Sequence, residues 1–240
     1  TGDNNFLTKA IAINKGLEEK MIKGNKIAHT NGQSLHDQVL FFEDYSYYID
    51  ALIALYEATY EIDWINKAIA FTKFSNIEFK QENSFYKFSS NQELLYSDIL
   101  IHLEDGVIPS ANSVMNFNLF RLSHYLGNKD FSIQAEKMIN NIIGKLESKV
   151  TDHMFWFWAS FNYSDSFFEL AISGPDAKEK AKELSLEYLP NAIIAANNEP
   201  SDFYLLKERF FKDETYIYVC VNKTCKFPVT NIKEALKLID

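Results

Sequence analysis

Residues 103–114 read LEDGVIPSANSV and run directly into a helix with one apolar side. This stretch combines two acids, a glycine, a proline and a Ser-Asn-Ser cluster. Such residues favour turns and helix N-termini, where their side chains can satisfy exposed backbone amides. We therefore predict a shaped loop, followed by a helix over residues 113–126 that stops at Gly127.

The composition limits the classes of protein to which the chain can belong. It has 240 residues, enough for one large domain or two small ones, and a net charge of −9. The negative charge argues against a nucleic-acid surface, and no apolar run is long enough to span a membrane. The 20 Phe, 13 Tyr and 3 Trp residues suit helix packing, but they also suit a cleft in which rings stack on sugars.

The first two-thirds of the chain repeat one helical pattern. Its unit is an apolar residue, an acid eight positions later that caps the next helix, and a small residue five positions further on. The pattern occurs at Leu55, Asp63 and Ala68, again at Leu122, Asp130 and Ala135, and in part at Asn5 and Ala10. Such a unit predicts a helical hairpin. Because the first copy is cut, we expect the chain to be a fragment of a longer hairpin protein.

The pattern changes after about residue 165. Residues 167–175 and 191–195 have the composition of strands, with a helix predicted between them at 177–188. A third strand is predicted at 215–221 and a closing helix at 232–239. We therefore predict a helical-hairpin region at residues 1–165 and a small βαβ-type element at 166–240 packed on it.

Several segments together carry a resemblance to a known family. They are residues 42–45, 55–59 with Trp64, 105–114, 172–174, and 218–225 with 228–230. In order and spacing, they resemble the C-terminal part of the YyaL/spermatogenesis-associated protein 20 family. Members of this family also carry an N-terminal thioredoxin-like domain.

The resemblance implies a mainly α fold. We expect part of an (α/α) hairpin toroid, similar to N-acylglucosamine 2-epimerases and six-hairpin glycosidases, with a small C-terminal α/β element. The chain departs from the family at Ala111, where Gly is usual, and at Ile99, where Arg is common. Loss of that arginine weakens an interpretation as a site for anionic ligands.

Two acidic pairs, Glu43-Asp44 and Glu104-Asp105, stand at predicted helix starts. In a hairpin toroid such positions reach the mouth of the central cavity, where carboxylates can act as acid and base or bind sugar hydroxyls. The alternative is that these acids cap helices and complement the helix dipole. The candidate catalytic residues are Asp44 and Asp105, and the candidate substrate-binding residues are Glu43, Tyr45, Glu104, Ser110, Asn112 and Ser113.

The cysteines and histidines predict no metal site and no cofactor. Cys220 and Cys225 have no second Cys or His pair nearby, which argues against zinc. CxxxxC is not a redox motif of known mechanism, so a structural role is favoured over a redox one. Two cysteines in such a chain indicate a reducing compartment, and we expect a cytoplasmic protein. The five histidines form no motif.

Two functions are compatible with these patterns. The first is a carbohydrate-active or sugar-binding domain with a small carbohydrate ligand, which leaves open an epimerase-like or glycosidase-like enzyme. The second is a non-catalytic scaffold that docks a thioredoxin-like domain or another protein. A pocket that contains both acidic pairs favours the first function, whereas acids consumed by helix caps favour the second.

Overall fold

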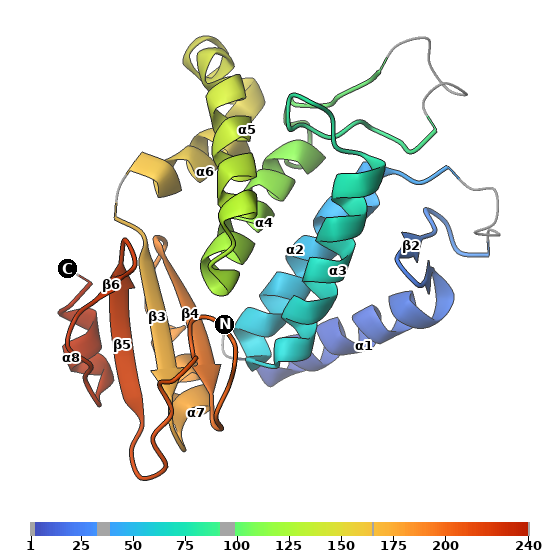
Figure 1. Ribbon diagram of the computed structural model, residues 1–240. Helices are drawn as coiled ribbons and strands as arrows, with labels where there is room; N and C mark the ends of the chain where they lie inside the picture. The colour runs from blue at the N-terminus through green and yellow to red at the C-terminus, as the bar shows by residue number, and fades with distance from the viewer. Residues whose placement is uncertain (1–2, 33–38, 92–98, 165, 240) are drawn as a thin grey trace.

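The computed structural model describes residues 3–32, 39–91, 99–164 and 166–239. Helices form the first part of the chain, and a small sheet with two short helices follows (Figure 1). The helices are α1 (Asn4–Lys20), α2 (Phe42–Thr59), α3 (Ile62–Glu78), α4 (Ala111–Leu126), α5 (Lys129–Ser148), the 3-10 helix η2 (Val150–His153), α6 (Met154–Ser164), α7 (Ala177–Leu184) and α8 (Ile232–Leu236). The strands are β1 (Ile22–Lys23), β2 (Lys26–Ile27), β3 (Phe168–Ser173), β4 (Ala192–Asn197), β5 (Tyr216–Val221) and β6 (Thr224–Cys225).

Helices α2 and α3 form one hairpin, and α4 and α5 form a second, as the repeat predicts (Figure 1). The first helix of each hairpin ends in the left-handed region, at Tyr60 (φ 56°) and at Gly127 (φ 60°). Gly127 is thus confirmed as a helix stop. The buried Tyr60 offsets its backbone cost with a hydrogen bond from its hydroxyl to the Ala181 carbonyl (3.2 Å). The predicted mainly α class is confirmed, with helical hairpins and a small C-terminal α/β element, and the toroid stays a prediction.

The N-caps of two helices differ from the prediction. Asp63 lies in the first turn of α3, after the N-cap Glu61, and Asp130 lies in the first turn of α5, after the N-cap Asn128. The Asn128 side chain accepts a hydrogen bond from the Phe131 amide (3.1 Å). The predicted caps were wrong, because the helix dipole also favours acids in the first turn, where they imitate a cap in the sequence.

The small residues of the repeat have the predicted role in both hairpins. Ala68 and Ala135 are fully buried. Because Ala135 has a short side chain, the side-chain amide of Asn116 can donate a hydrogen bond to the Ala135 carbonyl across the hairpin (2.7 Å). The equivalent Ala10 on α1 is exposed. The first copy of the pattern therefore forms a helix whose corresponding face is open.

The C-terminal sheet has the strand order β4-β3-β5-β6, and α7 packs against β3 and β4 (Figure 1). Strands β3 and β4 are parallel and α7 connects them, which confirms the predicted βαβ unit, whereas β5 is antiparallel to β3. Helices α7 and α8 end earlier than predicted, at Leu184 and Leu236. Gly174 (φ 140°) follows β3, and a Cβ there would lie 2.4 Å from the Thr215 Cα.

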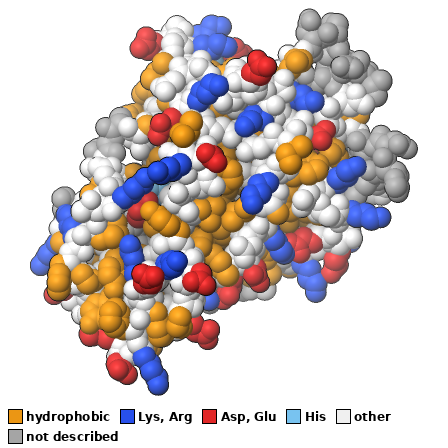
Figure 2. All heavy atoms as spheres, in the orientation of Figure 1, with side chains coloured by type: hydrophobic (Ala, Val, Ile, Leu, Met, Phe, Trp, Pro, Cys, Tyr) orange, Lys and Arg blue, Asp and Glu red, His pale blue; other side chains and the backbone are white. Residues whose placement is uncertain are grey.

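One hydrophobic cluster runs through both parts of the chain, from α2 and α4 to β3, α7 and β4. Tyr125 of α4 also donates a hydrogen bond to the Ile194 carbonyl of β4 (3.4 Å). On the outside, hydrophobic side chains gather over the C-terminal sheet and its loops, whereas charged side chains are scattered over the face in Figure 2. The division into residues 1–165 and 166–240 stays a prediction, and residue 165 lies outside the described residues.

Cys220 of β5 and Cys225 of β6 form a disulfide. The turn between these strands, Asn222-Lys223, has positive φ at both residues and places the cysteines opposite each other. The tight turn thus brings the two sulfurs together, and the structural role favoured for these cysteines over a redox one stays a prediction. Within the described ranges, no helix is long and apolar enough to cross a membrane, and the compartment stays a prediction.

Candidate functional site

The Asp105 carboxylate accepts hydrogen bonds from the backbone of two helix starts. One of its oxygens accepts hydrogen bonds from the Ser110 amide (2.7 Å) and the Ser113 hydroxyl (3.3 Å), both at the start of α4. The other accepts from the Phe155 amide at the start of α6 (2.7 Å). The Asp105 amide donates to the Asp152 carbonyl (2.7 Å). A single carboxylate therefore ties the loop of residues 103–114 to the beginnings of two helices.

The Ser-Asn-Ser cluster is also engaged within the protein. Ser110 is the N-cap of α4, and its hydroxyl accepts from the Ser113 amide (3.2 Å). The Asn112 side chain accepts from the Tyr86 amide (2.8 Å) and donates to the Tyr86 and His102 carbonyls (3.0 Å each). All three side chains are buried. The predicted capping role is confirmed, and the ligand role of these residues stays a prediction.

Asp44 and Tyr45 lie on the side of α2 that faces residues 27–29. The Asp44 carboxylate is 3.0 Å from His29 Nδ1, and burial raises the pKa of this carboxyl despite the histidine. Tyr45 is fully buried, stacks on Phe74 (5.4 Å between ring centroids), and accepts a hydrogen bond from the Ile27 amide (3.1 Å). The surroundings of Tyr45 are those of a core residue.

Glu43 and Glu104 line one pocket of about 170 Å³. Its walls include Phe88, His102 and Tyr47, and the two rings of Phe88 and His102 are 4.9 Å apart. The Tyr47 hydroxyl donates to the Pro109 carbonyl, and burial raises the pKa of Tyr47 to about 12. Among the described residues, neither glutamate has a hydrogen-bond or ion-pair partner. One acid of each predicted pair thus faces a shared pocket, whereas Asp44 and Asp105 do not line it.

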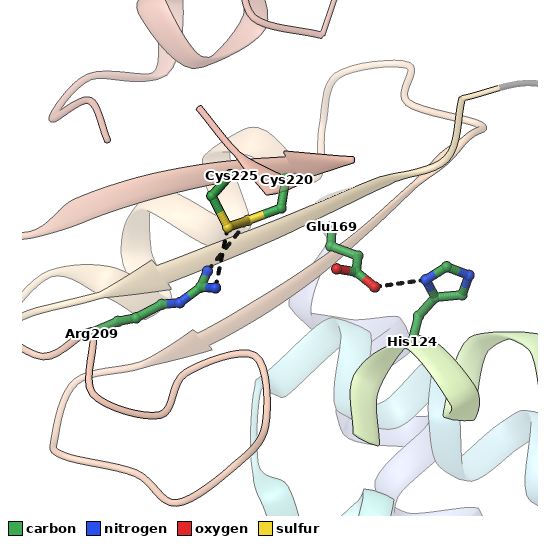
Figure 3. Close-up of a disulfide and its surroundings, with 5 residues drawn as sticks. All are labelled: His124, Glu169, Arg209, Cys220 and Cys225. Carbon is green, nitrogen blue, oxygen red and sulfur yellow. Dashed lines mark hydrogen bonds and ion pairs between the residues drawn. A yellow bond between two sulfur atoms is a disulfide. The ribbon is translucent and has the colours of Figure 1, made fainter. Parts of the chain in front are cut away.

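The sequence reasoning missed a histidine–carboxylate pair between the helices and the sheet. His124 Nδ1 of α4 lies 2.7 Å from the Glu169 carboxylate of β3, beside a cavity of about 530 Å³ (Figure 3). Glu169 belongs to a strand in which every residue is buried. An acid inside such an apolar strand is a signal in the sequence, because a buried carboxylate needs a partner.

A second charged group links α2 and α4. The Arg121 guanidinium is buried and pairs with Asp50 and with Glu57 (3.4 Å), while the Phe117 ring lies 4.4 Å from its central carbon. Arg121 also lines a cavity of about 320 Å³ with Tyr60 and parts of α7 and β4. Its bonds with two acids make it part of the helix packing.

Over residues 3–32, 39–91, 99–164 and 166–239, no group of three or more His, Cys, Asp or Glu side chains is arranged to hold a metal ion. The His29–Asp44 and His124–Glu169 pairs are two-residue contacts, the first joining α2 to the segment that follows β2 and the second joining α4 to β3.

Comparison with known proteins supports the family resemblance. The chain is 28% identical over 213 residues to spermatogenesis-associated protein 20 of Rattus norvegicus, and equally to that of Homo sapiens. It is 26% identical over 108 residues to an uncharacterised protein of Caenorhabditis elegans, covering 45% of this chain and 15% of that protein. The rat and human matches cover 83% of this chain, which spans 27% of the length of these relatives. The predicted resemblance is therefore confirmed, and no protein-family model matches the chain.

Among solved structures, the chain is similar to UGL with dGlcA-Glc-Rha-Glc, with a TM-score of 0.42 and 14% identity. The match covers 60% of this chain and 40% of that one. A likeness at this level carries no argument about this chain.

Proposed function

We propose that the chain binds a small neutral carbohydrate in the pocket between Glu43 and Glu104. The observation that carries the proposal is the pair of carboxylates, one from α2 and one from the loop before α4, that line the same pocket and have no hydrogen-bond or ion-pair partner among the described residues. Carboxylate oxygens accept hydrogen bonds from sugar hydroxyls, and two carboxylates in one pocket can hold one ring in a defined orientation.

The other walls of the pocket suit the same ligand. Phe88 offers an aromatic surface for the apolar side of a sugar. The volume of about 170 Å³ lies below the ~300–1,000 Å³ of pockets for drug-sized ligands, so a single ring is the expected occupant. Two negative charges repel an anionic sugar, which makes neutral sugars the expected class.

Asp105 and Asn112 have a positioning role in this proposal. Their hydrogen bonds hold the 103–114 loop against α4, and the loop carries Glu104 into the pocket that Glu43 also lines. Catalysis by Asp44 and Asp105 stays a prediction. It requires Asp105 to give up hydrogen bonds from two backbone amides, and exchanging bonds to a carboxylate costs roughly 1.5–3 kcal/mol each.

Thermal unfolding with a panel of neutral monosaccharides tests the binding proposal. A bound sugar at about 100 times its Kd stabilises the protein by about 2.7 kcal/mol and raises the melting temperature. Glu43→Gln and Glu104→Gln should remove the shift, whereas Glu147→Gln, an exposed acid on α5, should keep it. A panel without any shift, or a shift that persists in the double variant, rejects the proposal.

An apolar groove supports the scaffold as a second candidate function. It has a volume of about 910 Å³ and lies between α1 and α2, with Phe6 and Ile13 on one wall and Ala51 and Ala54 on the other. Phe6 and Ile13 are 63% and 65% exposed, so a partner would remove a large apolar area from water. The family resemblance makes a thioredoxin-like domain the proposed occupant.

Sedimentation of an equimolar mixture with a thioredoxin-like domain distinguishes the two functions. The scaffold requires a 1:1 complex that Ile13→Asp abolishes and that Ile77→Asp, at an even more exposed site on α3, leaves intact. Absence of a complex for the unchanged chain rejects this occupant.

A further inference from the structure

The Cys220–Cys225 disulfide has an unusual neighbour in Arg209. The guanidinium nitrogens lie 3.5 Å from the Cys220 sulfur and 3.3 Å from the Cys225 sulfur (Figure 3). The guanidinium also lies over the Tyr218 ring, 4.9 Å from its centroid. Within the described residues, no carboxylate is in ion-pair contact with Arg209. The cation therefore faces two sulfur atoms and an aromatic ring.

This arrangement fits the reduced cysteines better than the disulfide. A disulfide sulfur is a weak acceptor, whereas a thiolate is an anion that pairs with a guanidinium. Burial lowers the pKa of Arg209, since its charge is removed from water without a carboxylate in contact. A thiolate at either cysteine would supply the missing negative charge.

The acid next to the disulfide, Glu169, pairs with His124 and not with Arg209. Glu169 of β3 stands opposite Cys220 of β5 in the sheet, where its carboxylate could otherwise reach the same surroundings. Instead it points to His124, with 2.7 Å between oxygen and Nδ1, while Arg209 points to the sulfurs (Figure 3). The two charges near the disulfide thus have separate partners.

The two sulfurs also differ in access. Cys225 is exposed on the edge strand β6, whereas Cys220 is 2% exposed. The turn residues Asn222 and Lys223 line the cavity of about 530 Å³ next to β3. An attacking thiolate can approach Cys225 from solvent, and the buried Cys220 is left as the departing sulfur beside Arg209.

We propose that the Cys220–Cys225 disulfide is a site of thiol–disulfide exchange with a dithiol, in which Arg209 stabilises the departing thiolate. A thiolate of the dithiol attacks the Cys225 sulfur, the bond between Cys225 and Cys220 breaks, and Cys220 leaves as a thiolate. The second thiol of the dithiol, once deprotonated, attacks the mixed disulfide and releases the Cys225 thiolate, which takes a proton from water. The dithiol loses two electrons and becomes a disulfide, and the cysteine pair gains them.

Equilibration of the full chain with dithiothreitol and its oxidised form, followed by alkylation and mass spectrometry, tests the role of Arg209. Arg209→Gln should favour the disulfide about tenfold relative to the unchanged chain, equivalent to about 30 mV. Arg209→Lys should fall between them, and Lys212→Gln, which removes an exposed charge from the same segment, should behave as the unchanged chain. Equal constants for Arg209→Gln and the unchanged chain would overturn the proposal, as would a disulfide that resists dithiothreitol until the protein unfolds.

Trapping the intermediate gives a second test that does not depend on Arg209. In Cys220→Ser, the exposed Cys225 should form a 1:1 adduct with oxidised glutathione, because the cysteine that resolves the adduct is absent. In Cys225→Ser, the buried Cys220 should react at least tenfold more slowly. Equal reactivity of the two variants in the folded state contradicts attack at Cys225.

Discussion

The loop at residues 103–114 and the sheet around Glu169 use polar side chains in opposite ways. In the loop, Asp105, Ser110 and Asn112 accept or donate hydrogen bonds that hold backbone segments together. In and beside the sheet, Glu169 contacts a histidine and Arg209 contacts two sulfurs. A dense run of special residues therefore indicates structure here, whereas isolated charges among apolar residues indicate chemistry.

The largest expected effect is that of Asp105→Ala, which tests the structural half of this comparison. The change leaves the Ser110 and Phe155 amides without their acceptor, and bonds to a charged acceptor contribute roughly 1.5–3 kcal/mol each. We expect a loss of about 4 kcal/mol in the free energy of unfolding, measured in urea. Glu104→Ala, one residue earlier, should change it by less than about 0.5 kcal/mol. Similar losses for the two variants would break the comparison.

Gly174→Ala tests the sheet side, where the backbone between β3 and α7 leaves no space. A Cβ would lie 2.4 Å from the Thr215 Cα, at a φ of 140° that other residues avoid. Strain of this kind costs of order 1–3 kcal/mol, so we expect a loss of about 3 kcal/mol. Gly144→Ala on α5, where a Cβ meets nothing within 4 Å, is the control and should be neutral or stabilising. The free energies of unfolding decide the result.

Ser110→Ala has a smaller expected effect, because it removes one cap. The hydroxyl accepts from the Ser113 amide, and loss of such a cap costs about 1 kcal/mol. Ser110→Asp should restore most of the stability, since aspartate caps equally well. If instead Ser110→Ala leaves stability unchanged and lowers sugar binding, this serine belongs to the ligand site and the contrast between the two regions weakens.

Asp44→Asn is expected to have the smallest effect, and its sign depends on pH. The folded-state pKa of Asp44 is raised by burial, so the folded chain binds this proton more tightly than the unfolded chain. Stability from this group is therefore present below the unfolded pKa and is lost as pH rises through the folded pKa. Asp44→Asn should remove this pH dependence in urea titrations, with a difference below about 1 kcal/mol at pH 7. If the difference in the free energy of unfolding between Asp44→Asn and the unchanged chain widens as the pH falls, the raised pKa of Asp44 is contradicted.

The sequence predicts those parts of the fold that depend on local pattern. Gly127 ends a helix, Ala68 and Ala135 pack within hairpins, and β3 and β4 form the βαβ unit, all as periodicity and composition indicate. The hydrogen bond from Phe155 to Asp105 spans 50 residues and depends on how α6 docks. Helix capping is a local signal, whereas this contact is set by packing.

The dependence of long-range contacts on packing also explains why the residues of the candidate site were predicted only in part. The sequence left two interpretations open for each acidic pair, a cavity or a helix cap. Glu43 and Glu104 line the pocket of about 170 Å³, whereas α2 turns Asp44 toward His29 and the loop turns Asp105 inward. The pair of His124 and Glu169 joins residues 45 positions apart on different elements. Neither residue of this pair belongs to a sequence motif, and the contact forms only when α4 packs against the sheet.

The bond from Tyr60 to Ala181 has a consequence for the order of folding. It connects positions 121 residues apart, so the chain must close a long loop before the bond can form. We therefore expect the turn that ends α2 to form without this support, and the contact with α7 to form late in folding. The α2–α3 turn would then be the place where the helical part and the sheet become one cooperative unit.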